Sequence, residues 1–228
     1  MKKIYLLFGI IFSISANVFA QLSVVSSLPA DTLVAKILGT GVTVSNITYN
    51  GAAVASGTFT WGASGNGGFA NGIILTSGSA SVAANPNTGT GQGQSNNLGG
   101  DPQLTTLTTG TTLDATVLEF DFSVASDSVA FNYIFASDEY DDFVGSSFND
   151  VFGFFISGPG IVGTKNIAII PSTTTSVAIN NVNNGFASTF ANPTGPCNHC
   201  AYYRTNPFNA ITTAYDGLTT VLTAGSLV

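Results

Sequence analysis

Basic side chains, histidine and cysteine are all scarce in this sequence. Its 228 residues include five Lys and Arg against twelve Asp and Glu, with one His and two Cys. So few basic residues leave no positive surface for nucleic acid or for an anionic membrane. A Ser-His-Asp or Cys-His hydrolase would have to use His199, and no G-x-S-x-G motif accompanies it.

Long apolar runs are missing too, and the one apolar stretch near the N-terminus is too short for a comfortable membrane span. Two Lys precede this run at residues 4–14, and Val18 and Ala20 occupy the −3 and −1 positions of a cleavage site. The pattern predicts a secretory signal peptide over residues 1–20 and one domain over residues 21–228. Three basic residues then face twelve acidic ones, a net charge of −9 that would attract cations.

Helical patterns are nearly absent, with one exception at residues 27–39. There Ser27 can cap a helix, Pro29 suits its first turn and Gly39 supplies its end. The rest of the chain predicts short strands separated by turn residues, at residues 42–49, 57–61, 72–76, 117–124, 128–136 and 151–157. This organisation predicts an all-β fold, an antiparallel β-sandwich of jelly-roll type with one short N-terminal helix.

Three segments carry more specific expectations. Residues 117–124 alternate, so that their apolar side chains share one face while Glu119 and Asp121 share the other. Residues 128–136 are apolar on both sides, which predicts a strand covered on both faces. Residues 77–101 have little to bury and predict a long surface loop.

An acidic loop at residues 137–150 separates two of the most hydrophobic segments, 128–136 and 151–157, and would connect them if they pair as a hairpin. Hard oxygen ligands without His or Cys favour calcium, although the spacing is not that of an EF-hand. A solvated loop whose acids cap turns is the alternative, and a paired-carboxylate glycosidase is a third. The oxygen-bearing candidates for a metal site are Asp138, Glu139, Asp141, Asp142, Asn149 and Asp150.

Glu119 and Asp121 are secondary candidates for a cation site. Alternation places both on one strand face, where burial without a partner would be costly. Basic partners are few, so a second cation contact is one interpretation and an exposed sheet face is the other.

The sequence PCNHC at residues 196–200 invites a metal or redox interpretation. Cys197, His199 and Cys200 offer only three ligands, and no second pair completes a tetrahedral site. In an exported chain a disulfide between Cys197 and Cys200, or pairing with a cysteine beyond Val228, is more economical.

Aromatic residues beside turns are candidates for ligand binding. Trp61, Tyr202 and Tyr203 lie next to Gly- or Asn-rich segments and can stack on sugar rings. Half-buried packing residues are the simpler interpretation.

Four segments together resemble the choice-of-anchor L domain, a module of secreted bacterial proteins: LVAKILGTGVTVSNITYNG, GFANGIILTSG, LEFDFSVASDSVAFNYIFASDEYDDFVGSSFNDVFGFFISGPG and AYDGLTTVLTA. The resemblance implies a β-sandwich-like extracellular domain without a defined enzymatic activity. The final strands and a C-terminal anchor or sorting domain would lie beyond Val228, so we expect an incomplete domain with an unpaired edge.

The sequence thus predicts an exported cell-surface or secreted module that serves interaction, adhesion or structural display, and not an enzyme. Calcium is its expected cofactor, and a cell-surface glycan or protein is its expected partner. A carbohydrate-binding module is the alternative, and a hydrolase built on the acidic loop is a less favoured one. No nucleic acid is expected as a partner, and no membrane span is expected after signal cleavage.

Overall fold

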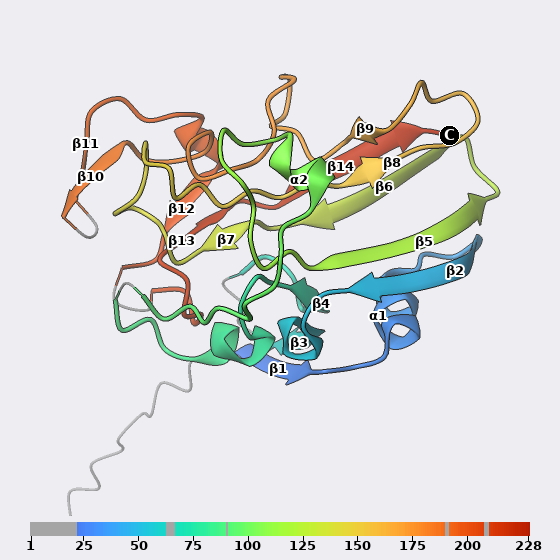
Figure 1. Cartoon of the computed structure of the whole chain (residues 1–228), viewed down its shortest axis with the longest axis horizontal. Coiled ribbons are helices and arrows are strands. Elements are labelled where there is room, and N and C mark those ends of the chain that lie inside the picture. Colours follow the sequence, from blue (N-terminus) through green and yellow to red (C-terminus); the bar gives the residue numbers. More distant parts are fainter. Residues whose placement is uncertain (1–21, 63–66, 90, 190–191, 208–209) are drawn as a thin grey trace, which may run out of the picture.

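Short antiparallel strands with little helix make up the fold (Figure 1). The structure is a computed structural model, and it describes residues 22–62, 67–89, 91–189, 192–207 and 210–228. Within these ranges the strands pair in six antiparallel sheets of two or three strands each. The predicted all-β class is therefore confirmed. The jelly-roll sandwich stays a prediction, and the predicted signal peptide lies outside the described residues.

The first sheet has the order β1-β3-β4 and contains β1 (Leu22–Ser26), β3 (Ser56–Trp61) and β4 (Asn71–Leu75). The last two of these strands match the segments expected from the sequence. Gly57 lies so close to the Val25 carbonyl of β1 that a side chain there would collide with it. Glycine at this position therefore lets β1 and β3 approach each other.

The predicted N-terminal helix is confirmed as α1 (Ala30–Ile37), whose Leu33 and Val34 are fully buried. Its start differs from the prediction. The N-cap is Pro29, and Ser27 lies outside the helix in a left-handed conformation with φ 61°. Proline fixes a φ of about −65° and so presets the first turn without a side-chain cap.

The longest strand pair joins β2 (Val42–Asn50) to β5 (Val117–Val124). Residues alternate along β5 between partly buried and exposed positions, as the sequence predicts. The register shifts between Ser45 and Thr48, where Asn46 has a positive φ of 52°. A bulge at this position lets one extra residue fit into β2.

A second long pair joins β6 (Ser128–Tyr133) to β14 (Leu222–Leu227). Two expectations are corrected here. Ala130 and Asn132 are exposed, so β6 is covered on one face and not on both. The hairpin considered between residues 128–136 and 151–157 does not form, and the backbone partner of β6 is β14.

Within residues 151–157 only β8 (Phe155–Ile156) is a strand, and it pairs with β9 (Lys165–Asn166). The residues before it pack across β6 instead of beside it. The Phe154 ring lies 4.6 Å from that of Phe131, centroid to centroid. Aromatic packing between layers has therefore replaced the expected backbone pairing.

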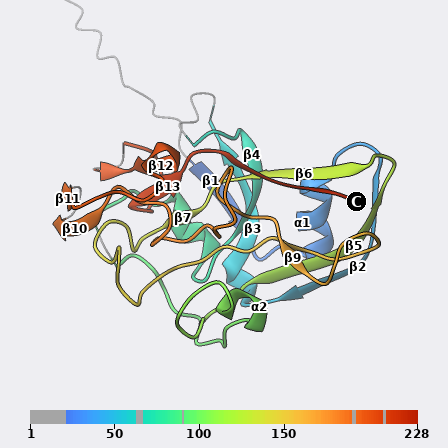
Figure 2. The same ribbon diagram turned by 90° about the horizontal axis from the view of Figure 1, so that it is seen from above.

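The sheet that positions the site has the order β12-β13-β7, with β12 (Tyr203–Thr205), β13 (Gly217–Thr219) and β7 (Ala136–Ser137). The hairpin of β10 (Phe186–Thr189) and β11 (Asn192–Thr194) lies at one end of the molecule. Two views show α1, β2 and β5 at the opposite end (Figures 1 and 2).

Short helical turns complete the fold: η1 (Ala53–Ala55), η2 (Ala80–Ala84), α2 (Pro102–Thr105) and η3 (Cys200–Tyr202). The η2 turn lies within the predicted surface loop at residues 77–101. Its Ala83 is fully buried, and the Ala83 carbonyl accepts a hydrogen bond of 3.2 Å from the Ala214 N–H. This part of the loop is therefore anchored to the C-terminal part of the chain, contrary to the expectation that it had little to bury.

Three clusters of buried apolar side chains form the core. The first surrounds Tyr140 and Ile170, the second Trp61 and Leu218, and the third Val129 and Ala224. Each cluster combines residues that are distant in the sequence, so the core depends on long-range strand pairing.

Candidate functional site

The acidic loop follows β7 directly, so strand pairing fixes where it begins. In the β7–β13 pair Ser137 lies opposite Gly217, and Ala136 lies opposite Leu218. The next residues outward are Asp138 on one chain segment and Asp216 on the other. The antiparallel register thus brings two carboxylates together at the end of this short ladder, where directly opposite Cβ atoms are about 4.5–5.5 Å apart.

Each of these carboxylates uses one oxygen in hydrogen bonds with the same neighbouring loop. Asp138 Oδ2 accepts from the N–H groups of Gln92, at 2.6 Å, and Gly93, at 3.3 Å. Asp216 Oδ1 accepts from Asn87 Nδ2 at 2.8 Å. The other oxygen of each acid, Asp138 Oδ1 and Asp216 Oδ2, is buried and has no hydrogen-bond partner among the described residues.

Burial in an acidic neighbourhood raises the pKa of several of these carboxyl groups. The pKa of Asp216 rises to about 7 because the group is buried, and Asp138 raises it further, while the bond from Asn87 opposes the shift. The pKa of Glu139 also rises to about 7, first through burial and then through the charge of Asp150. Neighbouring carboxylates disfavour each other's charged form, so their repulsion adds to the effect of burial.

The remaining candidates in the loop are bound to separate partners. Asp141 is 2% exposed, and its Oδ1 accepts a hydrogen bond of 2.7 Å from the Tyr203 hydroxyl. Asp150 Oδ2 accepts from Ser137 Oγ at 2.7 Å. Asn149 Oδ1 accepts from a backbone N–H at 3.0 Å, and Asp142 is exposed. Three of these four side chains therefore bind different partners.

In the part of the chain that the structure describes, no group of three or more Asp, Glu, His or Cys side chains could hold a metal ion. The secondary candidates Glu119 and Asp121 are exposed on β5. Asp121 Oδ2 accepts a hydrogen bond of 2.6 Å from Asn46 Nδ2. A six-residue calcium site, or a second one on β5, stays a prediction.

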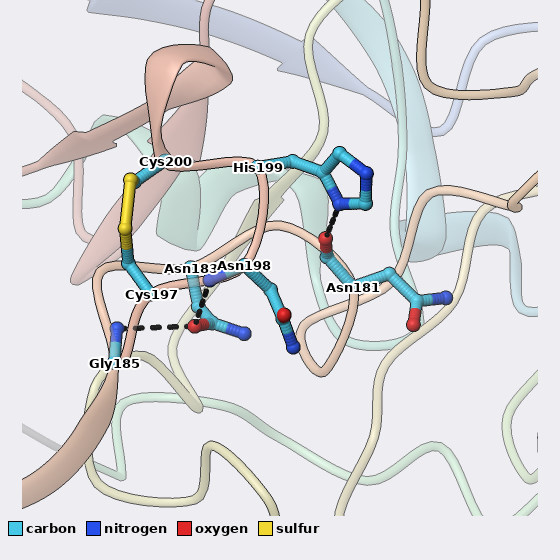
Figure 3. Close-up of a disulfide and its surroundings, with 7 residues drawn as sticks. All are labelled: Asn181, Asn183, Gly185, Cys197, Asn198, His199 and Cys200. Atoms are coloured by element: carbon cyan, nitrogen blue, oxygen red, sulfur yellow. Dashed lines mark hydrogen bonds between the residues drawn. A yellow bond between two sulfur atoms is a disulfide. The ribbon is translucent and has the colours of Figure 1, made fainter. Parts of the chain in front are cut away.

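Cys197 and Cys200 form a disulfide, as expected from the sequence, so neither is a free thiol (Figure 3). The turn that they close is held against another turn by Asn183. Asn183 Oδ1 accepts from the N–H groups of Gly185, at 3.0 Å, and Asn198, at 3.2 Å. His199 Nδ1 lies 2.8 Å from a backbone carbonyl oxygen, that of Asn181 (Figure 3). The disulfide and His199 thus form a structural turn.

The three aromatic candidates are engaged in packing. Trp61 is 8% exposed, and its Nε1–H donates a hydrogen bond of 3.0 Å to Thr212 Oγ1. Tyr202 and Tyr203 are partly buried against the first core cluster, and the Tyr203 ring lies 4.9 Å from that of Tyr140. Sugar stacking on these residues stays a prediction, and their packing argues for the simpler interpretation.

A different set of aromatic residues is exposed. The Phe143 and Phe148 rings lie 5.2 Å apart at the end of the acidic loop, and Phe148 is 61% exposed. Phe186 of β10 packs on the Gly145 backbone so closely that a side chain at Gly145 would overlap its ring. We call Phe143, Phe148 and Phe186 the aromatic tip.

Hydrogen bonds from one side chain hold the backbone of the aromatic tip. Asn180 Oδ1 accepts from the Gly145 N–H at 2.6 Å, and Asn180 Nδ2 donates to the Ser146 carbonyl at 3.0 Å. The tip therefore combines exposed apolar rings with an ordered backbone.

Sequence reasoning missed Asp216, Asn87 and the aromatic tip. Asp216 is the single acidic residue in an otherwise apolar and hydroxyl-rich stretch, between Tyr215 and Gly217. This isolated charge was the sequence signal that could have identified it as a candidate site residue. Its proximity to Asp138 depends on the β7–β13 register, which periodicity does not provide.

The sequence profile of the choice-of-anchor L domain matches residues 21–228. The chain belongs to the choice-of-anchor L family. A choice-of-anchor L domain is a cell-surface-related module, and the family is not a known enzyme family. No curated protein and no solved structure matches the chain significantly. Among the described residues, none of the helices has the length and apolar character needed to cross a bilayer.

Proposed function

We propose that this choice-of-anchor L domain is an exported interaction module, and that the aromatic tip is the surface with which it binds a partner protein. The observation that carries the proposal is the exposure of three Phe side chains, two of them on a loop whose backbone Asn180 holds and the third, Phe186, packed on that loop at Gly145. Large exposed apolar groups at one position mark interaction surfaces, and an ordered backbone reduces the entropy lost on binding.

The surroundings of the aromatic tip favour a particular kind of partner. Asp142 is exposed next to Phe143, and the mature chain carries a net charge of −9. Electrostatic complementarity therefore favours a protein surface with an apolar recess and Lys or Arg at its rim. A glycan is less suited, because Trp61 is buried and the Tyr203 hydroxyl is bound to Asp141.

The test compares the wild-type chain with a variant in which Phe143, Phe148 and Phe186 are replaced by Ser. Fluorescent protein is applied to intact cells of the producing species, and saturable retention on the cells is measured. We expect retention of the wild type, loss of retention after protease treatment of the cells, and at least a tenfold weaker binding of the triple variant.

Val162→Ser is the matched control, because Val162 is an apolar residue that is 98% exposed and does not belong to the aromatic tip. This variant should bind like the wild type. Equal retention of the triple variant would rule out the tip as the contact surface. Retention that resists protease but disappears after periodate oxidation of the cells would point to a glycan instead.

A further inference from the structure

The end of the β7–β13 ladder carries two acids with the same unusual environment. Ser137 lies opposite Gly217, so Asp138 and Asp216 are neighbours across the two segments. Like charges directly opposite each other destabilise a strand pair. This arrangement therefore needs a compensating positive charge or a proton.

The hydrogen bonds of this pair leave two oxygens without a partner. Asp216 is 2% exposed, and while its Oδ1 accepts from Asn87, its Oδ2 is buried without a partner among the described residues. Asp138 Oδ1 is likewise buried without a hydrogen-bond partner among the described residues, and Asp138 Oδ2 accepts from two backbone N–H groups. A buried carboxylate oxygen without a hydrogen bond raises the free energy of the folded state. In native proteins such an oxygen usually has a water molecule or an ion as its partner.

We infer that a divalent cation, with calcium as the best-suited ion, binds between Asp138 and Asp216 and joins the acidic loop to the C-terminal part of the chain. Both acids offer hard oxygen ligands, with neither His nitrogen nor thiolate, which favours calcium over zinc or copper. Calcium takes about six to eight oxygens, so backbone carbonyls and water would supply the ligands beyond these two acids. The site differs from one contained in the acidic loop, because its two central ligands come from separate segments.

Basic side chains do not offer an obvious substitute for this ion. The mature chain has three, and Lys36 lies in α1 while Lys165 lies in β9. The Nη1 group of Arg204 donates to the Gly67 carbonyl at 2.9 Å. A cation from solution can reach an exported protein at the millimolar calcium levels to which extracellular modules are tuned.

The experiment measures the thermal unfolding of the mature chain in chelator and across calcium concentrations up to about 10 mM, the range of extracellular calcium sites. At calcium about 100-fold above Kd, the unfolding equilibrium constant should fall about 100-fold, which corresponds to a rise in Tm of roughly 5–10 °C for a domain of this size. Calorimetric titration with calcium chloride should give one ion per chain.

Two variants locate the ion. Asp216→Asn keeps the shape of the side chain and its bond with Asn87, and it should abolish the calcium-dependent rise in Tm while raising Tm in chelator. Asp31→Asn, an exposed acid of α1, removes the same charge elsewhere and should respond to calcium like the wild type.

Three outcomes would overturn the inference. The first is a wild-type Tm that calcium leaves unchanged, which would indicate two acids that share a proton. The second is an Asp216→Asn variant with the full calcium response, which would place the ion elsewhere. The third is a calcium response lost equally in Asp31→Asn, which would indicate general charge screening. The inference does not depend on the partner of the aromatic tip, so either proposal can fail alone.

Discussion

Tyr140 and Asp141 show how the acidic loop combines burial with charge. Both side chains are almost completely buried, although the loop around them is polar. The Tyr140 hydroxyl donates a hydrogen bond of 2.6 Å to the Val182 carbonyl, and the Asp141 carboxylate accepts one from Tyr203. Hydrogen bonds therefore allow this part of a hydrophilic loop to enter the core.

Tyr140→Phe should lower the free energy of unfolding by about 1–3 kcal/mol, because it leaves the buried Val182 carbonyl without a donor. Urea denaturation of both proteins measures the difference. Tyr49→Phe is the control, since the Tyr49 hydroxyl makes a bond of the same 2.6 Å length, to the Ala52 carbonyl, from a partly exposed position. A larger loss in Tyr49→Phe would contradict the explanation.

The raised pKa values of Glu139 and Asp216 predict how stability depends on pH. Both groups have a pKa of about 7 in the folded chain, and unfolding returns the pKa to its ordinary value, 4.5 for Glu139 and 3.8 for Asp216. The folded chain therefore holds more protons between these values. Stability should be greatest below about pH 4 for these groups and should decrease as the pH rises through about 7.

Thermal melts in chelator at about pH 5 and pH 8 test this dependence, with the higher Tm expected at the lower pH. Glu139→Gln should reduce the difference between the two Tm values. Glu119→Gln, which removes an exposed acid of β5, should leave it unchanged. A Tm that rises with pH in the wild type would show that ionisation of these carboxyl groups does not destabilise the folded chain.

At the scale of elements, two turns support the aromatic tip. One is the disulfide turn, which Asn183 fixes against its neighbour (Figure 3). The other is the turn of Asn180, which holds the aromatic tip and is itself held through its carbonyl by Asn198 Nδ2 at 2.9 Å. The disulfide turn therefore supports the tip indirectly, through Asn180.

Asn180→Ala should lower the free energy of unfolding by about 1–3 kcal/mol, because two hydrogen bonds to the tip backbone are lost. Amide exchange at residues 143–148 should accelerate by more than the global change in stability explains. Asn132→Ala, at an exposed position of β6, is the comparison. Unchanged exchange at the tip would show that the loop is ordered by other contacts.

Replacement of Cys197 and Cys200 by Ser should lower the free energy of unfolding by about 2 kcal/mol, the value expected for a loop of a few residues in the chain-entropy model. Denaturant unfolding measures the change. Reduction of the wild type should produce the same loss, and the same reductant should leave the double variant unaffected. A reductant effect on the double variant would mean that the loss has another origin.

For the whole molecule, stability depends on strands that are far apart in the sequence. The β6–β14 pair places Ala224, which is fully buried, in the same cluster as Val129, Ile156 and Ile167. Residues on the opposite face of β14, such as Thr223, are exposed. One strand thus contributes both to the core and to the surface.

Ala224→Asp should prevent folding or cost several kcal/mol, because it buries a carboxylate among apolar side chains. Thr223→Asp adds the same charge one residue away, and its effect should be within about 1 kcal/mol. Circular dichroism and denaturant melts of both variants measure this contrast. Similar effects of the two substitutions would contradict this orientation of β14.

Local patterns predicted much of the fold but little of the site. The alternation of residues 117–124 and the Pro29–Gly39 signals identified β5 and α1, because both depend on neighbouring residues. The partner of β6 could not be predicted, since an apolar strand can pair with several others. Asp138 was recognised as a candidate from its acidic neighbours, whereas Asp216 needed the β7–β13 register.

The β6–β14 pair also constrains the order of events during synthesis. β6 leaves the ribosome long before β14. Among the described residues it has no backbone partner until Leu222–Leu227 has emerged. Contacts of such high sequence separation form slowly. The core cluster that contains Val129 and Ala224 therefore forms only after almost all of the described chain has been made, whereas the β1-β3-β4 sheet and the β2–β5 pair can form earlier.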